Sequence, residues 1–185
     1  MQALLDVDLF NLLSVPETFD MTDTQASAVM ASAAALCEAR RAFYLADLPS
    51  TLKYADFLDP SKWPAAFPVT RNAATYFPAP RVADPLDDLR LKAIAPSGTL
   101  AGVYARTDST RGIWKAPAGT DTTMNGAIDL STVVNDLENG QLNPKGINVL
   151  RSFPAFGRVV WGARTLRGSD AQADEYKYIP VRRLA

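Results

Sequence analysis

The feature that most restricts the fold is a strand–helix–strand pattern near the N-terminus. The apolar run LFNLLSV at 9–15 predicts a buried strand. An alanine-rich segment follows, in which Thr22 and Gln25 have the spacing of a capping box, and it predicts a helix. A second apolar run, AFYLADL at 42–48, predicts another buried strand. This order of elements is a βαβ unit, so we expect a parallel sheet.

The rest of the chain extends this pattern without a repeat, a low-complexity tract or a linker. A helix is predicted to begin with Ser97 as its N-cap, and a short one over 131–138 precedes a predicted turn at Asn139 and Gly140. Further strand-like runs lie at 73–84, 89–96, 127–130, 146–151, 158–165 and 176–184. The chain is therefore expected to form one α/β domain, with a mostly parallel sheet flanked by helices.

The absence of histidine restricts the chemistry more than any motif does. Without it the chain cannot assemble a Ser-His-Asp or Cys-His catalytic set, or a histidine-based metal site. A single cysteine, Cys37, can form neither an internal disulfide nor a cysteine-based zinc site. Because Cys37 shares a helical face with Ala26, Met30 and Ala33, we expect a buried, unreactive side chain. No metal or other cofactor is expected.

Charge and hydropathy exclude two further classes of partner. The net charge is −1, whereas general nucleic-acid binders carry a basic surplus. No apolar run is long enough to span a bilayer, and the first residues lack the basic segment of a signal peptide. We expect no nucleic-acid binding, no membrane insertion and synthesis in a reducing cytosol.

Two acidic positions have competing interpretations. Asp47 lies at the expected carboxyl end of the second strand, where open α/β sheets bind ligands. The same position, just before a proline, also suits a cap or turn residue. The cluster of Asp84, Asp87 and Asp88 surrounds a proline turn and predicts a solvated loop.

The segment RTDSTRGIWKAPAG at 106–119 combines long polar side chains with glycine and proline. Its charges and its aromatic ring would suit a phosphate site, a catalytic cluster or a shaped loop that contacts a neighbouring protein. Composition alone does not separate these three alternatives. Arg182 and Arg183 are adjacent and, on a strand, would face opposite ways, so that one could pair with an internal carboxylate while the other points out.

Ordered motifs along nearly the whole chain resemble those of contractile tail sheath proteins. The strongest are three consecutive segments at consistent spacing: AGVYARTDSTRGIWKAPAG (101–119), LNPKGINVLRSFPAFGRVVWGARTL (142–166) and YKYIPVRRL (176–184). Three upstream segments are also similar to stretches of that family: FNLLSVPE (10–17), CEARRAFYLADLPS (37–50) and YFPAPRVADP (76–85).

The resemblance implies a subtilisin-like topology without a catalytic triad, and a structural role. Sheath proteins of phages, phage-tail-like bacteriocins and extracellular injection systems stack as helical rings around an inner tube. The sheath contracts and drives the tube through a target cell envelope. The implied partners are neighbouring sheath subunits, the inner tail tube and the baseplate. The implied location is a virion tail or a phage-tail-like particle, with synthesis in the bacterial cytoplasm.

Family members are usually longer than this chain. We therefore expect residues 1–185 to be a single sheath-type domain that lacks the N-terminal arm and the C-terminal domain. Those arms add strands to neighbouring subunits, so the chain alone is expected to be mostly monomeric.

Sliding between rigid subunits suits charged, solvated contacts. We expect some of six residues to lie at subunit surfaces: Arg106, Asp108, Arg111, Lys115, Arg182 and Arg183. The competing interpretation is that Arg106, Asp108 and Trp114 brace their own domain. Two other functional classes stay open, a non-contractile adaptor or binding module on the same domain and a hydrolase.

Overall fold

The strands form two sheets in the computed structural model, which describes residues 2–63, 67–167 and 174–185. Within these residues the larger sheet has the order β1-β2-β3-β7-β8 and the smaller one β5-β4-β6. The larger sheet comprises β1 (Leu12–Ser14), β2 (Phe43–Ala46), β3 (Ala73–Phe77), β7 (Ile147–Phe153) and β8 (Gly157–Val160). The smaller sheet comprises β4 (Pro80–Ala83), β5 (Leu91–Ala93) and β6 (Asp129–Leu130).

The larger sheet is mostly parallel, as the βαβ pattern predicts. Strands β1, β2, β3 and β7 pair in parallel, and only β8 runs antiparallel to its neighbour β7. In the register of these pairs, Tyr44 of β2 lies opposite Leu13 on one side and Ala73 on the other. The expected α/β class is therefore confirmed.

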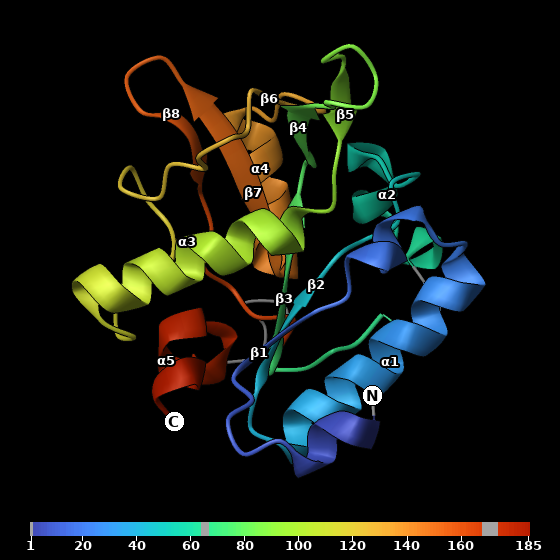
Figure 1. Cartoon of the computed structure of the whole chain (residues 1–185), viewed down its shortest axis with the longest axis vertical. Coiled ribbons are helices and arrows are strands. Elements are labelled where there is room, and N and C mark those ends of the chain that lie inside the picture. The colour runs from blue at the N-terminus through green and yellow to red at the C-terminus, as the bar shows by residue number, and fades with distance from the viewer. Residues whose placement is uncertain (1, 64–66, 168–173) are drawn as a thin grey trace.

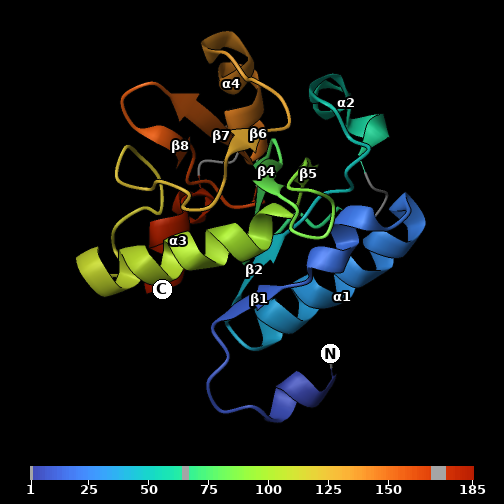
Figure 2. The ribbon, with the colours of Figure 1, turned by 45° about the horizontal axis from the view of Figure 1, so that its top comes forward.

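Helices cover both faces of this sheet. Helix α1 lies against one face and α3 against the other, as the two views in Figures 1 and 2 show. The α-helices are α1 (Asp23–Ala39), α2 (Tyr54–Leu58), α3 (Pro96–Arg111), α4 (Asp136–Leu142) and α5 (Ile179–Leu184). Short 3-10 helices lie at η1 (Gln2–Asp6), η2 (Pro16–Asp20), η3 (Pro60–Lys62), η4 (Asn143–Lys145) and η5 (Glu175–Lys177). No helix in the described ranges has the length and apolarity that crossing a membrane requires.

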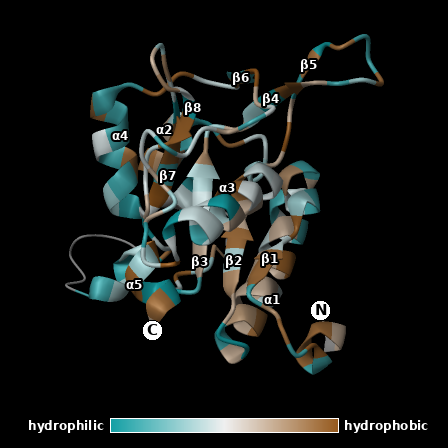
Figure 3. Ribbon diagram, turned by 60° about the vertical axis from the view of Figure 1, so that its left-hand side comes forward, coloured by the Kyte–Doolittle hydropathy of each residue, from teal (hydrophilic) through white to brown (hydrophobic). Residues whose placement is uncertain are grey.

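The alternation of strand side chains divides the core into two parts. Tyr44 and Ala46 of β2 pack in the cluster that contains α1, whereas Phe43 and Leu45 pack in the cluster that contains α3. Successive residues of a strand point to opposite faces, so a strand that is apolar throughout serves both clusters. Figure 3 shows this apolar character in the colouring of β1 and β2.

Helix α1 begins as the sequence predicts. The Thr22 and Gln25 capping box is present, and Ala26, Met30 and Cys37 are fully buried. Burial raises the pKa of the Cys37 thiol to about 12, so the thiolate that would react is not populated at neutral pH. The expectation of a buried, unreactive cysteine is confirmed.

Helix α3 differs from the prediction at both ends. Its N-cap is Ala95 and not Ser97, which is already inside the helix after Pro96. The Oδ1 atom of Asp47 accepts a hydrogen bond from the Ser97 backbone N–H at 2.8 Å. A side chain distant in sequence thus provides the cap, and local sequence does not reveal it. The helix also continues to Arg111.

Two other local predictions are wrong. Asn139 and Gly140 lie inside helix α4 and form no turn, because Asn135 and Glu138 build a capping box that starts the helix just before them. The single strand predicted at 73–84 is two strands in different sheets. Prolines lack the N–H that a continuous ladder needs, and Pro78 lies between β3 and β4.

The run at 176–184 is helical and not a strand. Pro180 occupies the first turn of α5, where the missing N–H costs nothing. The strand-like signal has a partial basis, since Tyr178 forms an isolated antiparallel bridge with Arg164 before the helix begins. The predictions at 89–96, 127–130, 146–151 and 158–165 correspond to the shorter or shifted strands β5, β6, β7 and β8.

Candidate subunit-contact surface

The segment 106–119 is the end of helix α3 followed by a loop that returns to β8. Arg106 lies in the helix, and its Nη2 donates to the carbonyl oxygen of Thr123 at 2.5 Å. Further along, the N–H of Gly119 donates to the carbonyl oxygen of Val160 at 2.8 Å. Both bonds attach the segment to its own domain, as the bracing interpretation predicts for Arg106.

Asp121 links two cations of this loop. The Nζ of Lys115 lies 3.3 Å from its Oδ1, and Nη1 of Arg111 lies 3.2 Å from its Oδ2. Lys115 also donates to the carbonyl oxygens of Ala116 and Ala118, at 3.0 and 2.9 Å. Lys115 is thus largely occupied within the loop. The Arg111 side chain is 59% exposed and has a single weak surface pair, so it can exchange partners at small cost.

Asp108 and Arg183 form the strongest ion pair of the region. Nη1 of Arg183 donates to Oδ1 of Asp108 at 2.9 Å, and Nη2 donates to Oδ2, so the contact is bidentate. The guanidinium also lies 4.9 Å from the centre of the Tyr104 ring, and the Arg183 side chain is only 9% exposed. The pair joins α5 to α3, so one of the adjacent arginines is paired internally, as predicted. The expectation that the two lie on a strand with the other pointing out is wrong, because both lie on helix α5 and Arg182 is buried.

Arg182 has a different environment from its neighbour. It is 8% exposed, and its Nε donates to the Oδ1 of Asn72, a neutral group, at 3.1 Å. Arg41 and Arg71 lie beside it around the same pocket. Sequence reasoning does not find Arg41 or Arg71, because the three arginines lie far apart in the chain and no local pattern joins them.

Trp114 projects its ring outward over a glycine. It is 68% exposed, although its ring covers Gly112, which has a φ of +96°. A Cβ atom at position 112 would lie 2.3 Å from Cη2 of the indole and would displace the exposed ring, while the positive φ itself favours glycine. The loop therefore presents a large apolar surface in a defined position.

Asp47 is a buried carboxylate at the start of helix α3. It is 1% exposed, its Oδ1 caps helix α3, and no hydrogen-bond partner of its Oδ2 lies among the described residues. Burial raises the pKa of this carboxyl to about 6, against the lowering effect of its bonds to Ser97. Within the described part of the chain, no group of three or more acidic or cysteine side chains could hold a metal ion.

Comparison with known proteins identifies the family. Residues 8–166 match the family model described as the phage tail sheath protein central domain. The chain belongs to the phage tail sheath protein family. The resemblance carried by the sequence motifs is thereby confirmed, and family members are structural sheath proteins. A search of curated protein sequences finds no match.

Solved structures of contractile particles contain similar chains. A chain of the anti-feeding prophage helical sheath in the contracted state is 36% identical, with a TM-score of 0.76, over 99% of this chain. A chain of the anti-feeding prophage baseplate is 35% identical, with a TM-score of 0.76, also over 99%. A chain of the PVC extracellular contractile injection system sheath in the contracted state is 32% identical, with a TM-score of 0.75, over 98%. The matched parts are 45%, 44% and 46% of those chains, so this chain spans less than half of their length.

The six charged residues expected at subunit surfaces divide into three groups in this sheath-family chain. Arg106, Asp108 and Arg183 contact their own domain, whereas Arg111 and Lys115 share one surface carboxylate. Arg182 lines a pocket. A contact between any of the six and a neighbouring subunit stays a prediction.

Proposed function

We propose that this chain is one domain of a structural subunit in a contractile sheath, which surrounds an inner tube and shortens to drive the tube through a cell envelope. The observation that carries the proposal is the match of nearly the whole chain to a sheath protein of the anti-feeding prophage in its contracted state. The proposed partners are neighbouring sheath subunits, the tube and the baseplate. The proposed location is a virion tail or a phage-tail-like particle.

The fold supports this role physically. A sheath must change the packing between subunits while each subunit keeps its shape, and coupled rearrangements of this kind use bistable interfaces between rigid bodies. Two apolar clusters on the faces of one sheet, together with the Asp108–Arg183 pair between α3 and α5, favour a rigid domain. Small gains per contact would add up over many copies.

We propose no catalytic role for the chain. Histidine is absent from the sequence, the cysteine thiol is buried, and the buried carboxylate of Asp47 caps a helix. A hydrolase activity would need a nucleophile and a base in contact, whereas in the described part of the chain the Asp47 carboxylate accepts only from Ser97 and the Asp47 main-chain oxygen accepts from the Thr18 hydroxyl. Turnover of ester or peptide substrates that is lost in Asp47→Asn would contradict this part of the proposal.

Electron microscopy of the full-length protein is the direct test. We expect helical sheath-like polymers, whereas the purified chain of 185 residues is expected to stay mostly monomeric. Polymers of the isolated chain would contradict the single-domain proposal. Failure of the full-length protein to polymerise, alone or with its tube, would contradict the sheath function.

Arg111 and Lys115 are the surface charges that we propose to contact a neighbouring subunit. In the full-length protein, Arg111→Glu with Lys115→Glu would place three acidic groups together with Asp121, and we expect impaired assembly or contraction. Lys53→Glu, an exposed change elsewhere, is the control. Normal assembly and contraction of the double variant would favour a purely internal role for these charges.

A further inference from the structure

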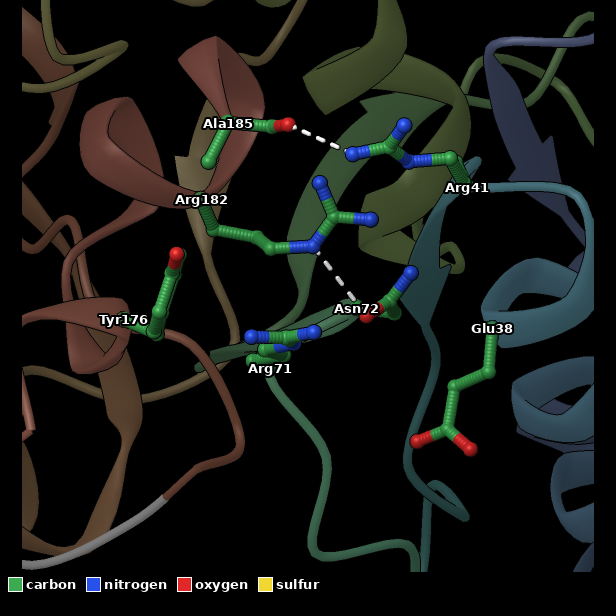
Figure 4. Close-up of a pocket in the computed structure, with 7 residues that line it drawn as sticks. All are labelled: Glu38, Arg41, Arg71, Asn72, Tyr176, Arg182 and Ala185. Carbon is green, nitrogen blue, oxygen red and sulfur yellow. Dashed lines mark hydrogen bonds between the residues drawn. The ribbon is translucent and has the colours of Figure 1, made fainter.

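Three arginines converge on one pocket, as Figure 4 shows. The pocket has a volume of about 350 Å³ and lies between the end of α1, the residues that precede β3, and α5. Each arginine comes from a different part of the chain. The lining residues are Glu38, Arg41, Arg71, Asn72, Tyr176, Arg182 and Ala185.

Arg182 is the arginine that the fold holds in a fixed position in this pocket. More than nine-tenths of the residue is buried, and its Nε is held by the Oδ1 of Asn72 at 3.1 Å. Asn72 is fixed in turn, since its Nδ2 donates to the carbonyl oxygens of Cys37 and Ala42 at 3.0 and 3.1 Å. The terminal nitrogens of Arg182 face the pocket in Figure 4, and no hydrogen bond from them is recorded among the described residues.

The pocket holds more positive than negative charge. Arg71 lies over the Tyr176 ring, 4.5 Å from its centre, and Arg41 donates to the main-chain oxygen of Ala185 at 2.8 Å. The carboxylate of Glu38 accepts from the Thr70 hydroxyl and points away from the three guanidinium groups in Figure 4.

Arg41 and Arg71, both exposed, disfavour the charge of the buried Arg182, although Arg71 also lies near enough to Asp174 to help lower the pKa of that carboxyl. Burial, and then the charges of Arg71 and Arg41, lower the pKa of Arg182. None of the three forms an ion pair with an acidic side chain within the ranges that the structure describes. A carboxylate placed between them would relieve the repulsion and accept from the free guanidinium donors, which recognise planar carboxylates in a bidentate manner.

Two exposed acidic side chains lie at the opposite end of the molecule. The β4–β5 hairpin carries Asp87 and Asp88 at its exposed tip, beside Leu86, which is 94% exposed. Asp87 has only a surface contact of 3.8 Å with Arg90, and no ion pair of Asp88 is recorded in the described residues. Figures 1 and 3 both place this hairpin at one end of the molecule and α5, which contributes Arg182 to the pocket, at the other.

We propose that the pocket of Arg41, Arg71 and Arg182 binds the acidic hairpin tip, Asp87 and Asp88, of a second copy of the subunit. This inference rests on the proposed sheath function. Because donor and acceptor surfaces lie at opposite ends of one chain, the contact is head-to-tail. Repeated head-to-tail contacts that do not close a ring generate helical assemblies.

Charge exchange in the full-length protein tests the contact. Arg41→Glu with Arg71→Glu, and separately Asp87→Lys with Asp88→Lys, should each lower the polymerised fraction at least tenfold in a sedimentation assay. All four changes in one chain should restore assembly, because every pocket then meets a hairpin of opposite charge. Lys53→Glu should assemble normally.

A second measurement does not depend on charge. Arg71→Cys combined with Asp88→Cys should give a ladder of disulfide-linked multimers from assembled full-length protein, and each single variant should give none beyond dimers. Cys37 is buried and does not compete.

The outcomes separate this inference from the proposed function. In one outcome the wild-type protein polymerises and the charge-reversed variants polymerise equally well; in another, the wild-type protein polymerises but the cysteine variant gives no ladder. Either result would overturn the hairpin–pocket contact and leave the sheath function standing. Wild-type protein that does not polymerise would overturn the proposed function itself.

Discussion

Arg182 and Arg183 are adjacent in α5, yet among the described residues only one of them has a counter-charge, which is the property that matters most for a buried cation. Arg183 meets the carboxylate of Asp108 in a bidentate pair over an aromatic ring. Arg182 meets a neutral amide and two other arginines. The first arrangement is complete within one domain and braces it. The second is incomplete, so it suits a contact with something outside the domain.

The largest expected effect comes from breaking the complete pair. Asp108→Ala leaves Arg183 nearly buried without a counter-charge, and we expect the free energy of unfolding to fall by about 3 kcal/mol. Urea denaturation of the purified chain measures this. Asp87→Ala, at an exposed carboxylate, is the matched control and should change the value by less than about 0.5 kcal/mol. Equal effects of Asp108→Ala and Asp87→Ala would show that the Asp108–Arg183 pair does not brace the domain, and the contrast with Arg182 would be lost.

The buried carboxyl of Asp47 is the corresponding case for a negative charge without a counter-charge among the described residues. Asp47 has a pKa raised to about 6, against an ordinary value of 3.8, because burial disfavours its charged form. Between these values the folded state holds a proton that the unfolded state has lost, so stability falls as pH rises through this window. The contribution is about 2 kcal/mol between pH 4 and pH 7.

The variant Asp47→Asn isolates this contribution from the other carboxylates. Its unfolding free energy, measured from pH 4 to pH 7, should lack the decline that Asp47 imposes on the parent chain. The parent-minus-variant difference should therefore become less favourable to the parent as pH increases. A difference independent of pH would show that Asp47 titrates normally.

The smallest effect is expected in the incomplete cluster. Arg71→Gln removes a repulsive neighbour of Arg182 and also a cation–ring contact with Tyr176. These terms oppose each other, so the net change in unfolding free energy should stay below about 0.5 kcal/mol. Thermal denaturation at low and high salt measures it. A loss as large as that in Asp108→Ala would mean that the cluster braces the domain after all.

Sequence patterns predicted the elements whose causes are local. Strands β1 and β2 and helix α1 depend on residues that are close in sequence. These are the apolar runs at 9–15 and 42–48 and the Thr22–Gln25 capping box. Periodicity sufficed there because both faces of the sheet are covered, which makes the strands apolar throughout.

The errors occur where the cause lies elsewhere in the chain. Serine is a common N-cap residue, so the sequence predicts Ser97 at the start of the helix. Instead, Asp47, fifty positions away, provides the capping bond. The run at 176–184 alternates like a strand, yet Pro180 and the packing of Ile179 into the α3-side cluster make it helical. The pocket of Arg41, Arg71 and Arg182 has no signature in sequence at all, because only the fold brings its members together.

The exposed ring of Trp114 has a practical consequence. It is 68% exposed and held over Gly112, whereas Trp63 and Trp161 are partly buried against other aromatic rings. Indole emission moves to shorter wavelength when water leaves the ring. A fluorescence shift on assembly would therefore come mainly from this one loop, so the protein carries its own optical reporter of whether the surface beside Arg111 becomes covered.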